Sequence, residues 1–282
     1  MKVSGFTIIR NGELYAYPFK EAILSVLPLC DEFVVNVGRS DDGTLDAVRS
    51  IESEKIRVFE SDWDMSLKGG KVLSEETNKA KAQCRGDWLF YIQSDEVLHE
   101  KYLKTVRSGM KANLEKKTVE GLRFRYVHFY GSYDYYQDNY RNWYIRETRV
   151  IRNSPEIVSW GDAMDFRHKD GSKLKVADVN AEIFHYGWVR PPEKLISKRR
   201  DFEKLYNDGE TAEKNIAGFT NYDDLGNLKR FKGTHPKVML ERISDSNWDF
   251  DAKLDSQRPD WVRKMLIFLH PLSKRVAKSG RK

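Results

Sequence analysis

The N-terminal part of the sequence alternates between short apolar runs of strand length and segments with helical spacing. The runs at residues 3–9, 32–37 and 56–59 are rich in β-branched and aromatic residues. The run at 32–37 is nearly continuous in apolar character, as expected for a strand covered on both faces. Between the runs, apolar residues recur every three or four positions at residues 19–27 and 45–51. This β-α-β-α-β pattern predicts a doubly wound parallel sheet.

A fourth apolar run, residues 88–92, leads directly into the polar residues 93–96. Ligands of open parallel sheets bind just beyond the carboxyl ends of strands, so a functional site is expected here. Neighbouring side chains of an extended segment point in opposite directions, which predicts Asp95 in the cleft and Glu96 braced against neighbouring structure. A carboxylate in the cleft suits Mg²⁺ or Mn²⁺. The alternative is that Asp95 caps a helix beginning near Val97.

After residue 96, the sequence predicts further strands and then, near residue 191, a change from strands to helices. Residues 121–130, 150–152 and 181–186 have the composition of further strands, which we expect to be mixed in direction. Helical segments dominate after them. We therefore expect one main domain at residues 1–190 and a helical accessory region with a basic tail at residues 191–282.

The first strand, the polar turn at residues 38–44, the helix at 75–80 and the segment 86–96 together resemble family 2 type glycosyltransferases of the GT-A fold. The resemblance covers about two thirds of the chain. It implies a Rossmann-like, mixed, mainly parallel sheet flanked by helices, and transfer of a sugar from a nucleotide-diphosphate donor. In that family the fourth strand ends in a motif whose last aspartate binds the metal on the diphosphate. Asp95 stands at that position, so Mn²⁺ or Mg²⁺ is the implied cofactor.

Two positions depart from the family pattern. The first acid of the motif is Gln93 here, and the base-recognising aspartate after the second strand is Asn36. Asp41 and Asp42, in the turn after that strand, either contact the ribose or stabilise the turn. Arg10 lies at a strand's carboxyl end, where the family meets the nucleotide. We expect nucleotide contacts from residues near the strand ends and their neighbours: Ile8, Ile9, Arg10, Asn36, Gly38, Asp41, Asp42, Lys71, Asn78, Gln93, Ser94 and Arg190.

His185 lies near the end of the predicted strand at residues 181–186. A lone histidine is usually structural, but the resemblance implies a late histidine as an additional metal ligand, and neutral imidazole suits Mn²⁺. The following Gly187, Arg190, Lys194 and residues 198–200 predict a basic flap over the diphosphate, where positive charge would stabilise the departing nucleotide. For residues 198–200 the sequence favours the alternative of a solvated basic helix.

An inverting transfer needs a carboxylate that deprotonates the acceptor hydroxyl. Asp162 and Asp165 are candidates, and Asp162 is preferred because Gly161 permits close backbone approach and Trp160 can stack on a sugar ring. Asp134 is a reserve candidate in an aromatic-rich stretch that suits carbohydrate or, equally, a core.

Charge and hydropathy restrict the partners. Of the net charge of +6, much lies near the C-terminus, around the apolar run 265–269. This segment is either a peripheral contact with an anionic membrane face or a packed terminal helix with a solvated tail. The sequence contains no run long enough to cross a bilayer and opens with a strand-like segment, so we expect a cytoplasmic protein. Nucleic acid is not an expected partner.

Cys30 and Cys84 are expected to be buried free thiols.

The sequence therefore predicts a metal-dependent glycosyltransferase that acts by inversion on a glycan or lipid-linked acceptor, in cell-envelope polysaccharide synthesis. One alternative is a non-catalytic nucleotide- or glycan-binding relative, because the first motif acid is missing. A nucleotidyltransferase is a weaker alternative, since residues 10–12 are too short for its glycine-rich loop.

Overall fold

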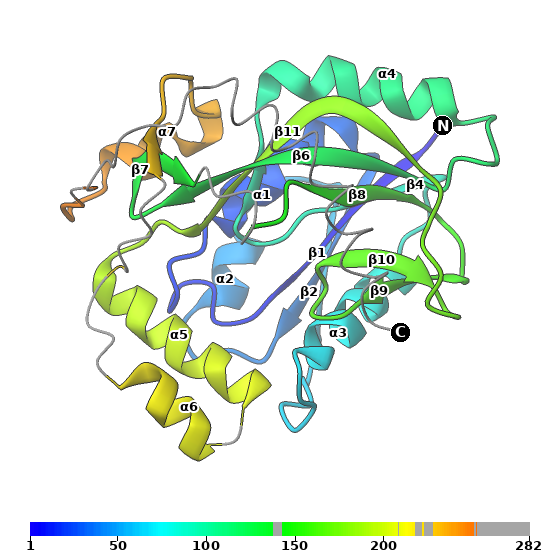
Figure 1. The fold of residues 1–282 in the computed structure, drawn as a ribbon. Helices are drawn as coiled ribbons and strands as arrows, with labels where there is room; N and C mark the ends of the chain where they lie inside the picture. The colour runs from blue at the N-terminus through cyan, green and yellow to red at the C-terminus, as the bar shows by residue number, and fades with distance from the viewer. Residues whose placement is uncertain (138–142, 208, 218–221, 223–227, 251, 253–282) are drawn as a thin grey trace, which may run out of the picture.

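The computed structural model describes residues 1–137, 143–207, 209–217, 222, 228–250 and 252. A large mixed sheet forms the centre of this part of the chain, with helices on both of its faces (Figure 1). The apolar run 265–269 and the basic tail lie outside the described residues.

Ten strands of the described chain form the large sheet, in the order β12-β7-β6-β8-β4-β1-β2-β3, and β11 pairs with both β6 and β5. Their bounds are β1 (Val3–Ile9), β2 (Glu32–Gly38), β3 (Ile56–Ser61), β4 (Trp88–Tyr91), β5 (Glu96–Leu98), β6 (Gly121–Tyr130), β7 (Ser132–Gln137), β8 (Arg146–Arg152), β11 (Val176–Trp188) and β12 (Leu228–Arg230). Strands β3, β2, β1 and β4 are parallel to one another. Beyond β4 the directions are mixed, because β8 is antiparallel to both β4 and β6 while β11 is parallel to β6. The predicted α/β fold class, with a mixed sheet flanked by helices, is confirmed.

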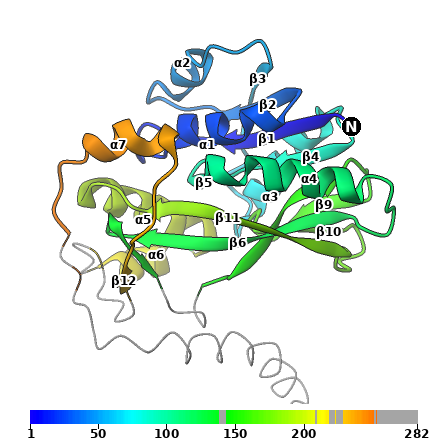
Figure 2. The ribbon, with the colours of Figure 1, turned by 90° about the horizontal axis from the view of Figure 1, so that it is seen from above.

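The remaining elements are a small hairpin and the helices. The hairpin consists of β9 (Ile157–Trp160) and β10 (Asp165–His168). The helices are α1 (Phe19–Val26), α2 (Thr44–Arg49), α3 (Lys71–Ala82), α4 (Leu103–Asn113), α5 (Pro192–Tyr206), α6 (Gly209–Ile216) and α7 (Leu240–Ser244), with short 3₁₀ turns at Leu27–Leu29, Glu100–Tyr102 and Lys237–Met239. Helices α3 and α4 lie on opposite faces of the sheet (Figure 1), and α1 lies on the same face as α4 (Figure 2).

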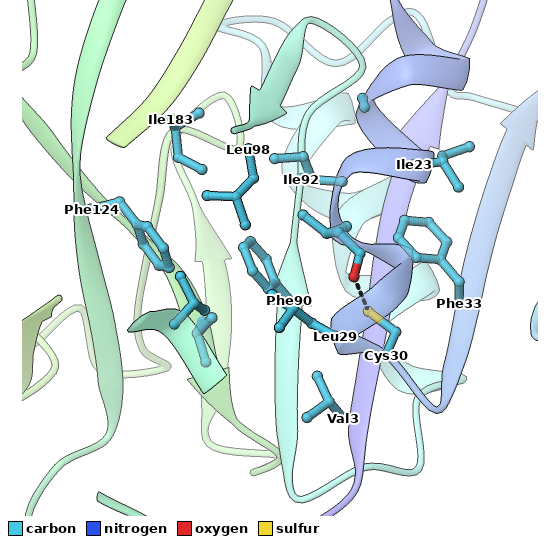
Figure 3. Packing of buried hydrophobic residues seen from close by; sticks show 14 of the residues in the cluster. Val3, Ile23, Leu29, Cys30, Phe33, Phe90, Ile92, Leu98, Phe124 and Ile183 are labelled. Carbon is cyan, nitrogen blue, oxygen red and sulfur yellow. Dashed lines mark hydrogen bonds between the residues drawn. The ribbon is translucent and has the colours of Figure 1, made fainter. Parts of the chain in front are cut away.

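Side chains of the sheet alternate between two apolar cores, as successive residues of a strand must. In β1, Ile9 packs in the core beneath α1 and α4, whereas Phe6 and Ile8 pack in the core beneath α3. Figure 3 shows the first core, in which Cys30 donates a hydrogen bond to the carbonyl of Val26 at 3.2 Å. Both cysteines are buried free thiols, as expected.

We expected Asp95 either to face the cleft or to cap a helix beginning near Val97, and the second of these is wrong. Residues 96–98 form strand β5, which pairs with β11, so Asp95 does not cap a helix there. The pairing is antiparallel and places Glu96 beside His185. The short strand therefore fixes the backbone on which Asp95 stands.

Helices α5, α6 and α7 follow residue 191 together with strand β12 of the large sheet, and α5 and α6 pack side by side (Figure 1). None of the helices in the described residues is long and apolar enough to span a membrane.

Candidate active site

A cavity of about 530 Å³ opens at the carboxyl ends of β1 and β4. The chain passes from β1 outward to β2 and β3 and then returns to β4 on the other side of β1, so the cavity lies at the topological switch point of the sheet. Its walls come from the ends of β1, β4 and β11, from the turn of residues 162–164, and from one face of α5.

Asp95 faces this cavity, and two nitrogen-bearing side chains, His185 and Lys198, approach it. The Oδ2 atom of Asp95 lies 3.7 Å from Nε2 of His185 and 3.5 Å from Nζ of Lys198. Burial opposes ionisation of Asp95, but the neighbouring His185, Lys198 and Arg190 hold its pKa well below the usual value. Asp95 is thus a buried carboxylate that stays charged throughout the neutral range.

The orientation of His185 follows from a second histidine. Nε2 of His128 lies 2.7 Å from the carbonyl oxygen of Tyr144, which can only accept, so this nitrogen carries the proton. Burial is the main cause that lowers the pKa of His128, to about 3, so the ring is neutral and its Nδ1 is an acceptor. Nδ1 of His185 lies 3.0 Å from that atom and must donate to it. In the neutral ring of His185, the lone pair is therefore on Nε2, the atom that faces Asp95.

The structure buries most of the Lys198 side chain rather than exposing it as part of a solvated helix. Its side chain is 14% exposed, and Nζ donates to the carbonyl of Gly187 at 3.1 Å. Nζ also lies 4.8 Å from the ring centre of Tyr17. Burial and the charge of Arg190 lower the pKa of Lys198 to about 7, against the opposing effect of Asp95.

Arg190 lies behind this cluster instead of lining the cavity. It is 1% exposed, donates to the carbonyls of Tyr15 and Gly187 at 2.7 and 2.6 Å, and stacks over Tyr17 at 4.8 Å. Gly187 lets the end of β11 approach Asp95 closely, since a β-carbon there would lie 2.7 Å from Oδ2 of Asp95. Arg190 therefore joins the loop after β1 to the end of β11.

Glu96 is braced as predicted from strand alternation. Arg149 donates two hydrogen bonds of 2.8 Å to its carboxylate, and both side chains are fully buried. Tyr126 and the backbone N–H of Gln93 donate to the same carboxylate at 2.7 and 3.1 Å. This network fixes the segment that carries Asp95.

The turn that contains Asp162 is bound to the end of β4. Gln93 donates through Nε2 to the carbonyl of Ala163 at 3.1 Å, and Arg149 donates to the carbonyl of Met164 at 2.9 Å. Asp162 lines the cavity and accepts a hydrogen bond of 2.7 Å from the hydroxyl of Tyr206.

The other two candidate bases do not line the cavity. Asp165 is half-buried and faces the backbone N–H of Thr148 at 3.4 Å. Asp134 is exposed on β7. Of the three acids proposed from the sequence, the structure brings Asp162 alone to the cavity wall.

Four residues expected to contact the nucleotide line the cavity: Ile8, Arg10, Gln93 and Ser94. The eight others lie elsewhere in the structure. Ile9 packs in the opposite core, Asp42 binds the backbone N–H of Leu14, and Asn78 accepts from the backbone N–H of Ser159. Asp41 and Lys71 are exposed away from the cavity, and Arg190 lies behind it.

Asn36 and Gly38 are separated from the cavity by packing against neighbouring residues. Asn36 is fully buried and donates to the carboxylate of Glu76 on α3 at 2.9 Å. The ring of Trp63 lies on Gly38, where a β-carbon would meet it at 2.6 Å, and Trp63 itself lines the cavity. The indole of Trp63 therefore forms the part of the cavity wall that we expected Asn36 and Gly38 to form.

Helix α5 closes one side of the cavity and is held by two loops. The hydroxyl of Tyr15, from the loop after β1, donates to Asp201 at 2.6 Å. The backbone N–H of Gly69 donates to the carbonyl of Leu205 at 2.8 Å. These contacts fix α5 over the sheet end.

Asp95 and His185 supply an oxygen and a nitrogen that could bind a divalent ion, provided that phosphate and water supply its other ligands. Among the residues that the structure describes, no three metal-binding side chains gather at one point. Asp95 and His185 nevertheless approach closely enough to share an ion, because their 3.7 Å separation is less than two ligand bonds of about 2.1 Å. Ions that bridge phosphates usually take only one or two protein ligands and complete their shell with phosphate and water.

No family model matches the chain, and the comparison with curated proteins gives no match. The fold is similar to that of S. aureus TarS 1–349 in complex with UDP-GlcNAc, at 16% identity and a TM-score of 0.42, over 78% of this chain and 71% of that chain. The chain spans 43% of the longer TarS structure. Another similar structure is glucosyl-3-phosphoglycerate synthase from Mycobacterium tuberculosis in complex with Mn²⁺, UDP-glucose and phosphoglyceric acid, at 20% identity and a TM-score of 0.32, over 44% of each chain.

Proposed function

We propose that this chain is a glycosyltransferase that binds a nucleotide-diphosphate sugar in the cavity and transfers the sugar to an acceptor hydroxyl. The observation that carries the proposal is the cluster of buried Asp95, buried His185 and largely buried Lys198 at the switch point of the sheet. A carboxylate, an imidazole and an ammonium together suit a diphosphate that is bound with a cation. The cavity volume of about 530 Å³ falls within the range of small-molecule sites.

In this proposal the nucleoside lies along Ile8 and Arg10, and the diphosphate lies beside Asp95 and Lys198. Lys198 stabilises the negative charge that develops on the departing nucleotide. The diphosphate in turn favours the ammonium form of Lys198, as an opposite charge nearby does.

The metal dependence is part of the proposal, with Asp95 and His185 as the two protein ligands for Mn²⁺ or Mg²⁺. When bound, the ion would supply Lewis-acid charge to the diphosphate. His128 keeps the Nε2 lone pair of His185 turned toward Asp95. Such outer partners of a metal-binding histidine fix its tautomer and orientation.

We propose Asp162 as the general base of an inverting displacement. It lines the cavity on a turn that Gln93 and Arg149 hold in place, and it accepts from Tyr206. A base that removes the acceptor proton must be rigidly positioned, which this turn provides.

The proposed acceptor is a glycan or a lipid-linked glycan in cell-envelope polysaccharide synthesis, and the proposed location is the cytoplasm, in peripheral contact with the inner membrane face. The support for this setting is the sequence resemblance and the apolar run 265–269 with its flanking basic residues.

A thermal-shift screen of nucleoside diphosphates with and without Mn²⁺ tests the donor side. A ligand that binds only the folded chain raises its melting temperature, so one base should stand out in Mn²⁺. Incubation with the matching nucleotide sugars should then release nucleoside diphosphate slowly and only with metal. Asp162→Asn should retain binding and lose most turnover, whereas Asp165→Asn should retain both. Binding without any turnover would instead identify a binding protein, and the absence of any shift would refute the proposal.

A further inference from the structure

The oxygen of Asp95 that faces His185 already has a cation beside it. Nζ of Lys198 lies 3.5 Å from Oδ2, the same atom that lies 3.7 Å from Nε2 of His185. A divalent ion held by Asp95 and His185 would share this oxygen with the ammonium.

The surroundings of the Lys198 ammonium form a cation site that the chain itself fills. Nζ donates to the carbonyl of Gly187 at 3.1 Å. The ring centres of Tyr17 and Phe202 lie 4.8 and 5.2 Å away. A carboxylate, a carbonyl and aromatic faces are the groups that stabilise a cation in a protein.

An ammonium and a divalent ion on one buried oxygen repel each other strongly, because charge is poorly screened away from water. We propose that Lys198 is a tethered cation that occupies Asp95 in the metal-free protein, and that it moves to the donor diphosphate when metal and donor bind. This inference rests on the proposed function and deepens it. The four-carbon stem of lysine lets the ammonium move while α5 stays in place.

The exchange has a thermodynamic consequence for the order of binding. Metal alone must displace Lys198 from Asp95 without giving the ammonium another partner, so metal alone binds weakly. A diphosphate supplies that partner, so metal and diphosphate bind with positive coupling, and the coupling is reciprocal.

Calorimetric titrations of the full chain test this exchange with two probes, MnCl₂ alone and Mn²⁺ with inorganic pyrophosphate. Lys198→Met should bind Mn²⁺ alone about 5-fold or more tightly than the parent, the lower end of usual couplings. It should bind the Mn²⁺–pyrophosphate pair more weakly. Lys198→Arg, which keeps the charge, should behave like the parent with Mn²⁺ alone. Lys214→Met, which removes the same charge from a side chain that is 77% exposed on α6, should change neither titration.

Equal or weaker Mn²⁺ binding by Lys198→Met would overturn the inference, and so would an absence of Mn²⁺ binding in both parent and variant. Binding of nucleoside diphosphates measured beside these titrations tells whether the transferase proposal fails too. Lys198→Gln, which is also uncharged but polar, answers the same question if circular dichroism shows that the methionine variant is unfolded.

Discussion

Nδ1 of His128 and Nδ1 of His185 lie 3.0 Å apart on the paired strands β6 and β11, which place the two residues in register. Because Nε2 of His128 donates to a backbone carbonyl, the pair can form only one arrangement of protons while His128 is neutral. The strand register thereby determines which nitrogen of His185 faces Asp95.

His128 is not a proposed metal ligand, but its replacement should still lower the affinity for Mn²⁺ through its effect on His185. His128→Phe removes the acceptor for His185, and Mn²⁺ affinity should fall by about 10-fold or more, as for other outer partners of metal ligands. His128→Asn keeps an oxygen acceptor near the position of Nδ1 and should restore much of the affinity. Calorimetry in the presence of pyrophosphate gives both values. If His128→Phe and His128→Asn bind Mn²⁺ equally, the histidine pair has no role in orienting a ligand.

The buried pair of Arg149 and Glu96 should be important for folding. Arg149→Met leaves Glu96 fully buried without its charge partner, and the free energy of unfolding should fall by about 3–5 kcal/mol. The matched change Arg123→Met breaks an exposed pair with Asp178 and should cost about 1 kcal/mol or less. Urea unfolding of the two variants compares them. Similar losses would contradict the assignment of Arg149 as a buried structural charge.

The stability of the fold should depend on pH through Glu147. Burial raises the pKa of this carboxyl from 4.5 to about 7, although the charge of Arg149 partly opposes the rise. The folded chain thus binds the proton more tightly than the unfolded chain. The contribution of Glu147 to stability is therefore largest below a pH near 4.5, is lost as the pH rises through about 7, and then levels off. Glu147→Gln should be more stable than the parent by up to about 3 kcal/mol at high pH.

Urea unfolding at about pH 5 and about pH 8 measures this difference. Glu156→Gln, at a side chain that is 65% exposed, is the control and should follow the parent. A constant gap between Glu147→Gln and the parent at both pH values would show that Glu147 is not the titrating group.

The C-terminal segment should contribute to membrane contact. It lies outside the described residues, but its sequence combines an apolar run at 265–269 with flanking lysines and arginines. Deletion of residues 261–282 should abolish co-sedimentation with vesicles that contain an anionic lipid. Vesicles of neutral lipid alone serve as the control. Unchanged binding to the anionic vesicles after deletion would exclude this segment as the membrane contact.

The parallel half of the sheet was predictable from local patterns. Val3–Ile9 is a strand in both the prediction and the structure, because its β-branched and aromatic residues favour a strand. Strand β5 was not predicted, since its three residues are held by pairing with β11, far along the chain. The β9-β10 hairpin is likewise short and lacks a strong alternating pattern.

The site was predictable only where strand ends determine it. Asp95 and His185 lie together as the resemblance implied, while their metal role remains a prediction. The burial of Lys198 was missed, although Leu195, Lys198 and Phe202 are spaced by three and four residues on one helix face, a signal that was present in the sequence. The role of His128 depends on the register of two distant strands, for which a single sequence carries no signal.

The most direct test of the metal-assisted nucleotide site is a calorimetric titration of the nucleoside diphosphate selected by the thermal-shift screen into the parent and Asp95→Asn, each in Mn²⁺ and in EDTA. The parent should bind about 10-fold or more tightly in Mn²⁺ than in EDTA, within the usual range of coupling between two ligands. Asp95→Asn, with its fold verified by circular dichroism, should lose this gain because the ion loses its charged ligand, and His185→Ala should lose part of it. An equal gain in the parent and in Asp95→Asn would contradict the site proposed for this chain.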